Sequence, residues 1–235
     1  RHLAAISPYV IREYRGRTRA RWHLVDNPVA DEFFALRREG VPGRILFAGN
    51  IGESKNPLAL LRAAATLRRE VAPGAFEIRL AGPTLSPRYE RKLRDFAAEE
   101  RLGGSVAFLG PLSRAELLSE YASAAIVVLP SRQETRPLAL MEAMAAGIPV
   151  VASRTAGIPD LVEDGSTGVL FPPEEPAALA EALRRLIRDP LLGREMGLRG
   201  RETASARFRA ADIARRYREI YEIVAADASA SARPH

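Results

Sequence analysis

Short apolar runs rich in β-branched residues alternate along this chain with segments of helical period, and this alternation constrains the fold more than any other feature. Six runs are typical of buried strands, and they lie at residues 44–49, 76–82, 105–110, 125–130, 148–153 and 168–171. The segments between most of them are long enough for a crossover helix. Strands joined in this way pair in parallel through right-handed crossovers, so the pattern predicts a parallel sheet covered by helices.

The helical segments carry their own start and stop signals. Four helices are predicted at residues 56–70, 86–100, 113–124 and 137–147. Pro57 stands in the first turn of one helix, Ser113 begins a capping box in another, and Gly147 ends the last. A short helix and turn follow at 157–165. We therefore expect an α/β fold with a Rossmann-like parallel sheet of about six strands, flanked by helices, over roughly residues 44–188.

The two ends of the chain lie outside that pattern. Residues 2–14 predict a strand and a helix of a domain further upstream, and residues 22–34 predict a linker. Residues 208–226 predict an amphipathic helix, and residues 227–235 a frayed tail. The apolar stripe of that helix consists of Ile213, Tyr217, Ile220, Tyr221 and Val224. The chain begins without Met or a signal peptide, which indicates an excised fragment.

Composition excludes several classes of function. The chain has no cysteine, which excludes a thiolate nucleophile, a zinc–thiolate site and a disulfide framework, and favours a cytoplasmic location. No apolar run approaches the ~20 residues that a membrane span needs. The net charge is +6, but the 35 basic residues are mixed with 29 acidic ones. That mixing argues against nucleic-acid binding and leaves peripheral contact with the inner face of a membrane as an open expectation.

The loops after the strands are where chemistry is expected, because ligands of parallel sheets bind beyond the carboxyl ends of the strands. These loops lie at residues 50–55, 82–83, 110–112, 131–137 and 153–157. The fourth loop contains Glu134, Thr135 and Arg136. The helix after it offers a free N–H at Leu138, and with the helix dipole this makes an anion site worth on the order of 1 kcal/mol. Glu142, about one and a half turns later, suits the vicinal hydroxyls of a ribose better than a phosphate.

A second loop faces this one across the predicted crevice. Residues 49–57 lead from the first strand of the sheet into its helix. Gly52 allows close backbone approach, and Lys55 can reach an anion as a point charge. A phosphate cradle flanked by the carboxylates of Glu134 and Glu142 matches the diphosphate and the hydroxyls of a nucleoside diphosphate-sugar.

Four ordered blocks of the sequence are similar to one family of enzymes. Residues 131–153, "SRQETRPLALMEAMAAGIPVVAS", resemble the E-x7-E signature of retaining GT-B glycosyltransferases of group 1, the glycogen-synthase-like and mannosyltransferase-like enzymes. The similarity continues through residues 156–173 and also covers the loop at 46–57 and the linker at 24–34. Because several blocks match in order over nearly the whole chain, the resemblance is far more specific than a lone pair of glutamates.

The resemblance implies roles for the loop residues. Glu134 would contact hydroxyls of the donor sugar, Glu142 would hold the ribose, and Lys55 with the amides near Leu138 would neutralise the diphosphate. The base would meet backbone around residues 110–112. The expected donor-binding residues are Asn50, Gly52, Lys55, Gly110, Leu112, Glu134, Thr135, Arg136, Leu138 and Glu142, with Glu134 and Lys55 as the catalytic ones. The donor would be a UDP-sugar or a GDP-sugar, with no cofactor and no metal, since protein cations replace the metal.

Two departures from the family pattern affect the phosphate side of the site. Asn50 stands where the family commonly has an arginine five residues before the lysine, and the family's Glu-Gly-Phe-Gly loop is Glu-Thr-Arg-Pro here. We hypothesise that Arg136 supplies the charge that Asn50 lacks and stabilises the departing diphosphate.

By resemblance, this chain is one half of a two-domain enzyme whose reaction takes place in the cleft between the domains. The family's acceptor site and its general catalytic histidine lie in the amino-terminal domain. We expect residues 1–34 to be a remnant of that domain with the linker, 35–206 the nucleotide-sugar-binding domain, 207–226 a helix that crosses back, and 227–235 a disordered tail. The expected activity is retaining, metal-independent transfer of a hexose to a glycan, such as one of the cell envelope, or to a lipid or small molecule. This half alone is expected to be inactive.

Two other classes of function stay open. The altered phosphate contacts favour a non-catalytic nucleotide-binding or regulatory module, whereas the intact pair of glutamates opposes it. A sugar-nucleotide epimerase of the same fold would need a complete cleft, and the block "EAMAAG" disfavours it.

Overall fold

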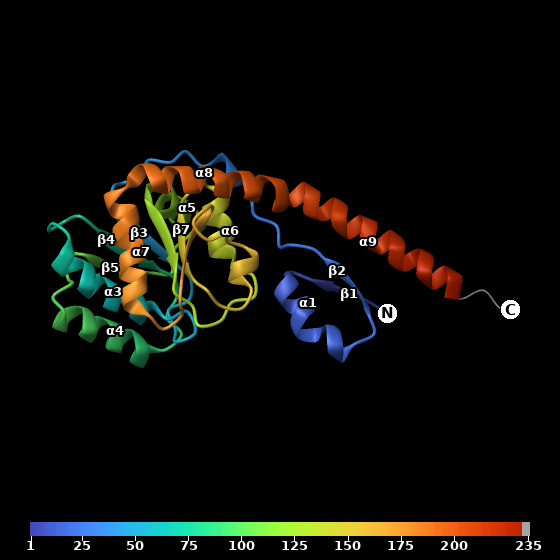
Figure 1. Cartoon of the computed structure of the whole chain (residues 1–235), viewed down its shortest axis with the longest axis horizontal. Helices are drawn as coiled ribbons and strands as arrows, with labels where there is room; N and C mark the ends of the chain where they lie inside the picture. Colours follow the sequence, from blue (N-terminus) through green and yellow to red (C-terminus); the bar gives the residue numbers. More distant parts are fainter. Residues whose placement is uncertain (232–235) are drawn as a thin grey trace.

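The computed structural model describes residues 1–231, and its larger part is built around a six-stranded parallel sheet (Figure 1). The strands are β3 (Arg44–Ala48), β4 (Glu77–Ala81), β5 (Val106–Gly110), β6 (Ile126–Leu129), β7 (Val150–Ser153) and β8 (Gly168–Phe171). Their order across the sheet is β5-β4-β3-β6-β7-β8, and every neighbouring pair is parallel. All six predicted strands form, and the α/β fold class is confirmed.

Helices flank this sheet; those before β8 join its strands, and the last two follow it. They are α3 (Pro57–Glu70), α4 (Pro87–Glu99), α5 (Arg114–Ser123), α6 (Leu138–Ala145), the 3₁₀ turn η2 (Ile158–Asp160), α7 (Pro176–Arg188) and α8 (Pro190–Arg207). Helix α3 packs against α4 and α7, and α6 packs against α8. Strands β6 and β7 are buried along their whole length, as expected for the centre of a parallel sheet covered on both faces.

Helix ends follow the signals in the sequence. Pro57 is the first residue of α3, and the capping box of α5 forms, with the Ser113 hydroxyl accepting from the backbone N–H of Glu116 at 3.3 Å. Leu58, Leu61 and Ala65 of α3 are buried as a helical stripe requires. The buried surface of α3 extends beyond that stripe, because the helix is held between the sheet and two other helices.

The first residues form a separate small unit. Strand β1 (His2–Ala5), helix α1 (Pro8–Tyr14), the 3₁₀ turn η1 (Arg15–Arg17) and strand β2 (Arg21–Leu24) precede a short helix, α2 (Asp31–Ala35). Strands β1 and β2 pair in parallel with each other and with no strand of the large sheet. The strand and helix predicted over residues 2–14 are therefore present, and part of the predicted linker is a strand.

The final helix, α9 (Ala210–Ser231), runs outward from the sheet and lies along the β1–β2 unit (Figure 1). Ile213 and Ile220 pack against Val25, with Tyr217 and Val224 partly buried beside them. Tyr221 is 67% exposed, so its assignment to the apolar stripe was wrong. Residues 227–231 are helical, which corrects the expected tail, and residues 232–235 lie outside the described part. None of the helices within residues 1–231 has the length and apolar character to cross a membrane.

Candidate functional site

A cavity of about 530 Å³ lies at the carboxyl ends of the strands, where the loops were expected to converge. This volume falls within the range of ~300–1,000 Å³ that is usual for small-molecule sites. Among the residues expected to bind the donor, those lining the cavity are Asn50, Lys55, Leu112, Glu134, Arg136, Leu138 and Glu142. Gly52, Gly110 and Thr135 do not line it.

Sheet topology brings the lining residues together. Strand β3 lies between β4 and β6, so the loops that follow these three strands meet at one edge. The backbone N–H of Arg132 donates to the carbonyl of Ser54 at 2.8 Å and ties the loop after β6 to the loop after β3. At Gly82, with φ of 140°, an added Cβ would lie 2.1 Å from the carbonyl oxygen of Gly49, so only glycine allows these two loops to approach so closely.

The first predicted pair, Glu134 and Lys55, is in direct contact. The Lys55 ammonium donates to Glu134 Oε1, and the Ser131 hydroxyl donates to the same oxygen at 2.8 Å. The Glu134 side chain is 9% exposed and that of Lys55 30%, so the lysine is the more accessible partner. The carboxylate is thus held in a fixed orientation at the cavity wall by two donors.

The second carboxylate, Glu142, is held in place by Tyr121, a residue that the sequence analysis did not single out. The hydroxyl of Tyr121, which is fully buried, donates to Glu142 Oε2 at 2.9 Å and also lies 3.2 Å from the carbonyl of Ala139. Arg114 Nη1 lies 4.0 Å from Glu142 Oε1. Burial raises the pKa of Glu142 above its ordinary value, while the Tyr121 hydrogen bond and Arg114 oppose the shift.

Arg136 has a different partner from the one expected. Its side chain is fully buried and forms an ion pair with Asp26, whose Oδ2 also accepts from Arg207 Nη2 at 3.2 Å. Its Nη1 donates to the carbonyl of Asp160 at 3.4 Å, and its guanidinium stands 5.4 Å from the centre of the Phe208 ring. Burial lowers the pKa of Arg136, and the pairing with Asp26 opposes that shift.

This arrangement changes the interpretation of Arg136. Its guanidinium is committed to Asp26, which comes from the chain segment that leads into the large domain. The hypothesis that it replaces the charge missing at Asn50 therefore has no support in the geometry. Sequence reasoning missed Asp26, since an aspartate next to Asn27 in a linker carries no local signal of its partner.

The loop 153–157 packs against the backbone of the loop that carries Glu134. The backbone N–H of Gly157 donates to the carbonyl of Glu134 at 2.8 Å. A Cβ added at Gly157 would lie 1.9 Å from the carbonyl oxygen of Thr135, so this position requires glycine. Thr135 therefore contributes its backbone to this support and not its side chain to the cavity. In the same way Gly52 packs against Leu85, and the Gly110 carbonyl accepts from Gly82 at 2.8 Å.

Within residues 1–231, no three or more His, Asp or Glu side chains lie close enough together to hold a metal ion.

The fold and the cavity define an α/β domain with a cavity of small-molecule size at the carboxyl edge of a parallel sheet. Residues 29–203 match the family described as glycosyl transferases group 1, and the chain belongs to this family. The resemblance stated from the sequence motifs is thereby confirmed.

Known proteins similar to this chain agree with that assignment. The chain is 35% identical over 192 residues to the D-inositol 3-phosphate glycosyltransferase of Corynebacterium kroppenstedtii, with 79% of this chain and 42% of that protein covered. Among solved structures, the sucrose-phosphate synthase of Thermosynechococcus elongatus superposes with a TM-score of 0.81 at 28% identity, over 96% of this chain and 59% of that one. HepE of Anabaena in complex with UDP superposes with a TM-score of 0.78 at 22% identity, over 95% of this chain and 63% of that one.

Proposed function

We propose that this chain is the donor-binding half of a retaining glycosyltransferase and that its cavity binds a nucleoside diphosphate-sugar. The single observation that carries this proposal is the convergence of Glu134, Lys55 and Glu142 on one cavity of about 530 Å³ at the carboxyl edge of the sheet. Two anions and a cation in that arrangement complement hydroxyls at two points and a diphosphate between them.

Glu142 is proposed to bind the ribose. Its Oε2 accepts from Tyr121, which leaves Oε1 to accept from vicinal hydroxyls of the ligand. The carboxylate lies on the cavity side of α6, and its 18% exposure leaves a short path to the ligand. A hydrogen bond between a hydroxyl and a charged carboxylate contributes about 1.5–3 kcal/mol, enough to define the nucleoside end of the site.

Lys55 and Glu134 are proposed to act at the diphosphate and the sugar. Without ligand the two side chains neutralise each other. When the donor binds, the Lys55 ammonium can turn toward the diphosphate, while Glu134, still held by Ser131, accepts from sugar hydroxyls. The free N–H groups at the start of α6 add positive potential on the same side of the diphosphate. No metal is needed in this scheme, because the lysine and the helix amides supply the positive charge.

In the proposed reaction the bond between the anomeric carbon and the diphosphate breaks, and the acceptor oxygen bonds to the same face of that carbon. The departing phosphate oxygen takes the acceptor proton, so no enzyme nucleophile is required. Lys55 stabilises the negative charge that develops on the leaving diphosphate. Stabilisation at that point lowers the barrier more than it strengthens donor binding, because the charge grows as the bond breaks.

The donor is proposed to be a UDP-sugar or a GDP-sugar, with its base against the backbone near Pro111 and Leu112. The complex of HepE with UDP supports the first of these. The chain spans 42% of the length of its curated relative from Corynebacterium, so we propose that an amino-terminal domain supplies the acceptor site. A glycan, a lipid or a small molecule is the proposed acceptor class, and work in the cytoplasm with peripheral membrane contact is proposed for the whole protein.

Calorimetric titration with UDP, GDP and ADP tests the donor proposal directly. We expect one diphosphate to bind selectively and its affinity to fall in the Glu142→Ala variant. If none binds, or if the variant binds as well as the parent chain, the donor assignment is wrong.

A non-catalytic nucleotide-binding module is the second candidate. Two features favour it: Asn50 is uncharged, and Arg136 is buried in an ion pair with Asp26. Among the residues lining the cavity, Lys55 is then the cation left to face the diphosphate. Transfer assays on the full-length protein separate the two, since a binding module would take up the diphosphate yet release no hexose from the donor.

A further inference from the structure

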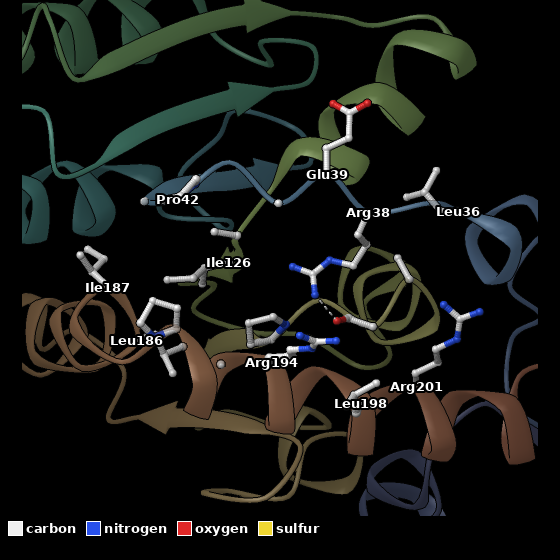
Figure 2. A pocket seen from close by; sticks show the side chains of 18 of the residues that line it. Leu36, Arg38, Glu39, Pro42, Ile126, Leu186, Ile187, Arg194, Leu198 and Arg201 are labelled. Atoms are coloured by element: carbon white, nitrogen blue, oxygen red, sulfur yellow. Dashed lines mark hydrogen bonds between the residues drawn. The ribbon is translucent and has the colours of Figure 1, made fainter.

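A second cavity, of about 770 Å³, lies at the opposite edge of the sheet (Figure 2). It is lined by residues that precede three strands, Gly43 before β3, Ala125 before β6 and Pro149 before β7. The connecting segment 36–43, which precedes β3, closes one side, and helices α7 and α8 close the other. This cavity is therefore separate from the proposed donor site, which lies at the carboxyl ends of the same strands.

Three arginines line this cavity, Arg38, Arg194 and Arg201, and Figure 2 shows their side chains around it. Two backbone carbonyls hold Arg38 in place: Nη1 donates to the carbonyl of Gly147 at 2.6 Å and Nη2 to that of Ala124 at 3.2 Å. Its Nε is buried with no hydrogen-bond partner among the described residues. Arg201 Nη2 donates to the carbonyl of Phe34 at 2.5 Å.

The positive charge of this cluster is not balanced by carboxylates. Within residues 1–231, none of the three arginines has an acidic oxygen within ion-pair distance. Glu39 also lines the cavity, but its carboxylate points away from the arginines (Figure 2). Burial lowers the pKa of Arg38, and the charge of Arg194 lowers it further, as expected where cations gather without an anion.

A structural role accounts for Arg38 but not for Arg194. Arg38 satisfies carbonyls at the ends of two helices, α5 and α6, which is a sufficient reason for its position. Arg194 is exposed on α8, and within residues 1–231 no hydrogen bond or ion pair holds its guanidinium. A charged group placed beside two other cations raises the electrostatic energy of the fold unless an anion joins them.

The remaining walls are apolar. Leu186 and Ile187 come from the end of α7, Pro190 and Leu198 from α8, and Ile126 from the start of β6. Leu198 is 53% exposed and stands at the rim, one helical turn beyond Arg194. An inorganic anion would fill only a small part of a cavity of this volume. The cationic and apolar lining of the cavity together fit an anion that carries an apolar body.

We propose that this cavity is a second ligand site, which binds an organic phosphate with its phosphate group at Arg194, Arg201 and Arg38 and its apolar body against Leu186, Ile187 and Leu198. Arginine suits a phosphate because its planar guanidinium can donate two parallel hydrogen bonds to it. The phosphate can belong to a soluble phosphate ester or to a lipid headgroup, since both present the same group to the arginines.

Hexyl phosphate is a suitable probe for calorimetry. Inorganic phosphate, which carries only its anionic group, and hexanol, which carries only its apolar chain, are the control compounds. The 235-residue chain is used with and without saturating UDP, so that binding at the carboxyl edge is separated from binding at the amino edge. We expect hexyl phosphate to bind equally with and without UDP, and more tightly than inorganic phosphate or hexanol. If hexyl phosphate does not bind, or if UDP displaces it, the proposal is wrong.

Arg194→Gln and the double variant Arg194→Gln with Arg201→Gln test the contacts. Arg185→Gln is the matched control, because Arg185 is exposed on the adjacent helix α7 and does not line the cavity. We expect Arg194→Gln to weaken hexyl phosphate about tenfold, the effect of one charge-assisted hydrogen bond, and the control to leave it unchanged. Equal affinity of the double variant and the parent chain would overturn the assignment. Unchanged unfolding of Arg194→Gln in urea confirms that the fold is intact.

Sedimentation with vesicles distinguishes the two sources of phosphate. Vesicles of phosphatidylcholine are compared with vesicles that also contain phosphatidic acid, whose headgroup is a phosphate monoester. Capture by phosphatidic acid that Arg194→Gln abolishes assigns the site to a lipid headgroup. Hexyl phosphate binding without such capture assigns it to a soluble ester, and both results support the site. Capture that persists in Arg194→Gln counts against it.

Discussion

The hydroxyl of Tyr121 donates a 2.9 Å hydrogen bond to Oε2 of Glu142, so a fully buried phenol carries the carboxylate that is proposed to bind the ribose. Burial raises the pKa of both groups. The tyrosine hydroxyl therefore stays protonated, and it stabilises the ionised form of a carboxylate that its surroundings disfavour. A nucleoside that donates to Oε1 would complete the hydrogen bonding of the same group.

Glu142→Gln is expected to weaken binding of the preferred nucleoside diphosphate by about tenfold or more, because the ligand loses a hydrogen bond to a charged acceptor. The fold should not suffer, since the amide oxygen of glutamine can still accept from Tyr121 and a buried charge is removed. Calorimetry and urea unfolding measure the two quantities. Glu99→Gln, an exposed change on α4, is the control. A loss of stability with unchanged affinity would contradict the proposed role.

The raised pKa of Glu142 predicts an opposite pH dependence for stability and for binding. The folded state holds this proton more tightly than the unfolded state. The contribution of Glu142 to the free energy of unfolding is therefore largest below its ordinary pKa and is lost as the pH rises through the raised value. Nucleotide affinity should rise over that same window, because the ribose hydroxyls need the carboxylate. Titrations from about pH 4.5 to 7 should show this rise in the parent chain. The Glu142→Gln variant should lack it, and a parallel slope in that variant would refute the assignment.

Asp26→Asn is expected to destabilise the chain by about 3–5 kcal/mol, because it leaves the buried guanidinium of Arg136 without its counter-charge. Glu134 stands two residues before Arg136 in the same loop, so a change at Arg136 should displace Glu134 and lower the affinity for the diphosphate as well. Urea unfolding gives the first quantity and calorimetry the second.

Asp31→Asn is the matched control for that change, since Asp31 faces Arg209 at 3.5 Å with its side chain 76% exposed. It should have little effect on either quantity. If Asp26→Asn behaves like Asp31→Asn, the buried ion pair does not hold the loop.

Gly157→Ala is expected to cost about 1–3 kcal/mol of stability and to weaken nucleotide binding, because its methyl group would force the carbonyl of Thr135 to move. That carbonyl lies 1.9 Å from the position of the new Cβ, and the same loop carries Glu134. Gly103→Ala, where a Cβ would meet no atom within 4 Å, should change neither quantity. Thermal unfolding and calorimetry measure both variants, and normal binding by Gly157→Ala would show that the loop is not supported in this way.

Several features of the fold could be predicted because they depend on neighbours in the sequence. The strands follow from β-branched runs, and the start of α5 follows from Ser113 and Glu116, which are three residues apart. The edge that carries Glu134 and Glu142 follows from a general property of parallel sheets, since loops after the strands all emerge at their carboxyl ends. The end of the chain was harder. Helix α9 continues to Ser231, because residues 227–231 contain no helix breaker and the stripe before them packs against Val25.

Contacts between distant residues could not be predicted in this way. Sequence analysis placed Lys55 and Glu134 at one site, but not in contact across the 79 residues that separate them. It assigned Arg136 to the diphosphate, whereas the structure pairs Arg136 with Asp26 in the linker. The loop with Arg136 and the linker with Asp26 each have a recognisable local pattern, but neither pattern indicates that the two segments lie in contact.

The sequence by itself determined the kind of fold, the edge of the sheet where the proposed donor cavity lies and the charged residues placed there, because periodicity, caps and crossover length act over a few residues at a time. Only the tertiary structure decided which partners those residues have: Tyr121 beneath Glu142, Asp26 against Arg136, and three arginines around a cavity at the amino edge. The physical reason is the order of the strands. Packing β3 beside β6 brings together segments about eighty residues apart, and the burial that results sets the charge state and the orientation of each side chain.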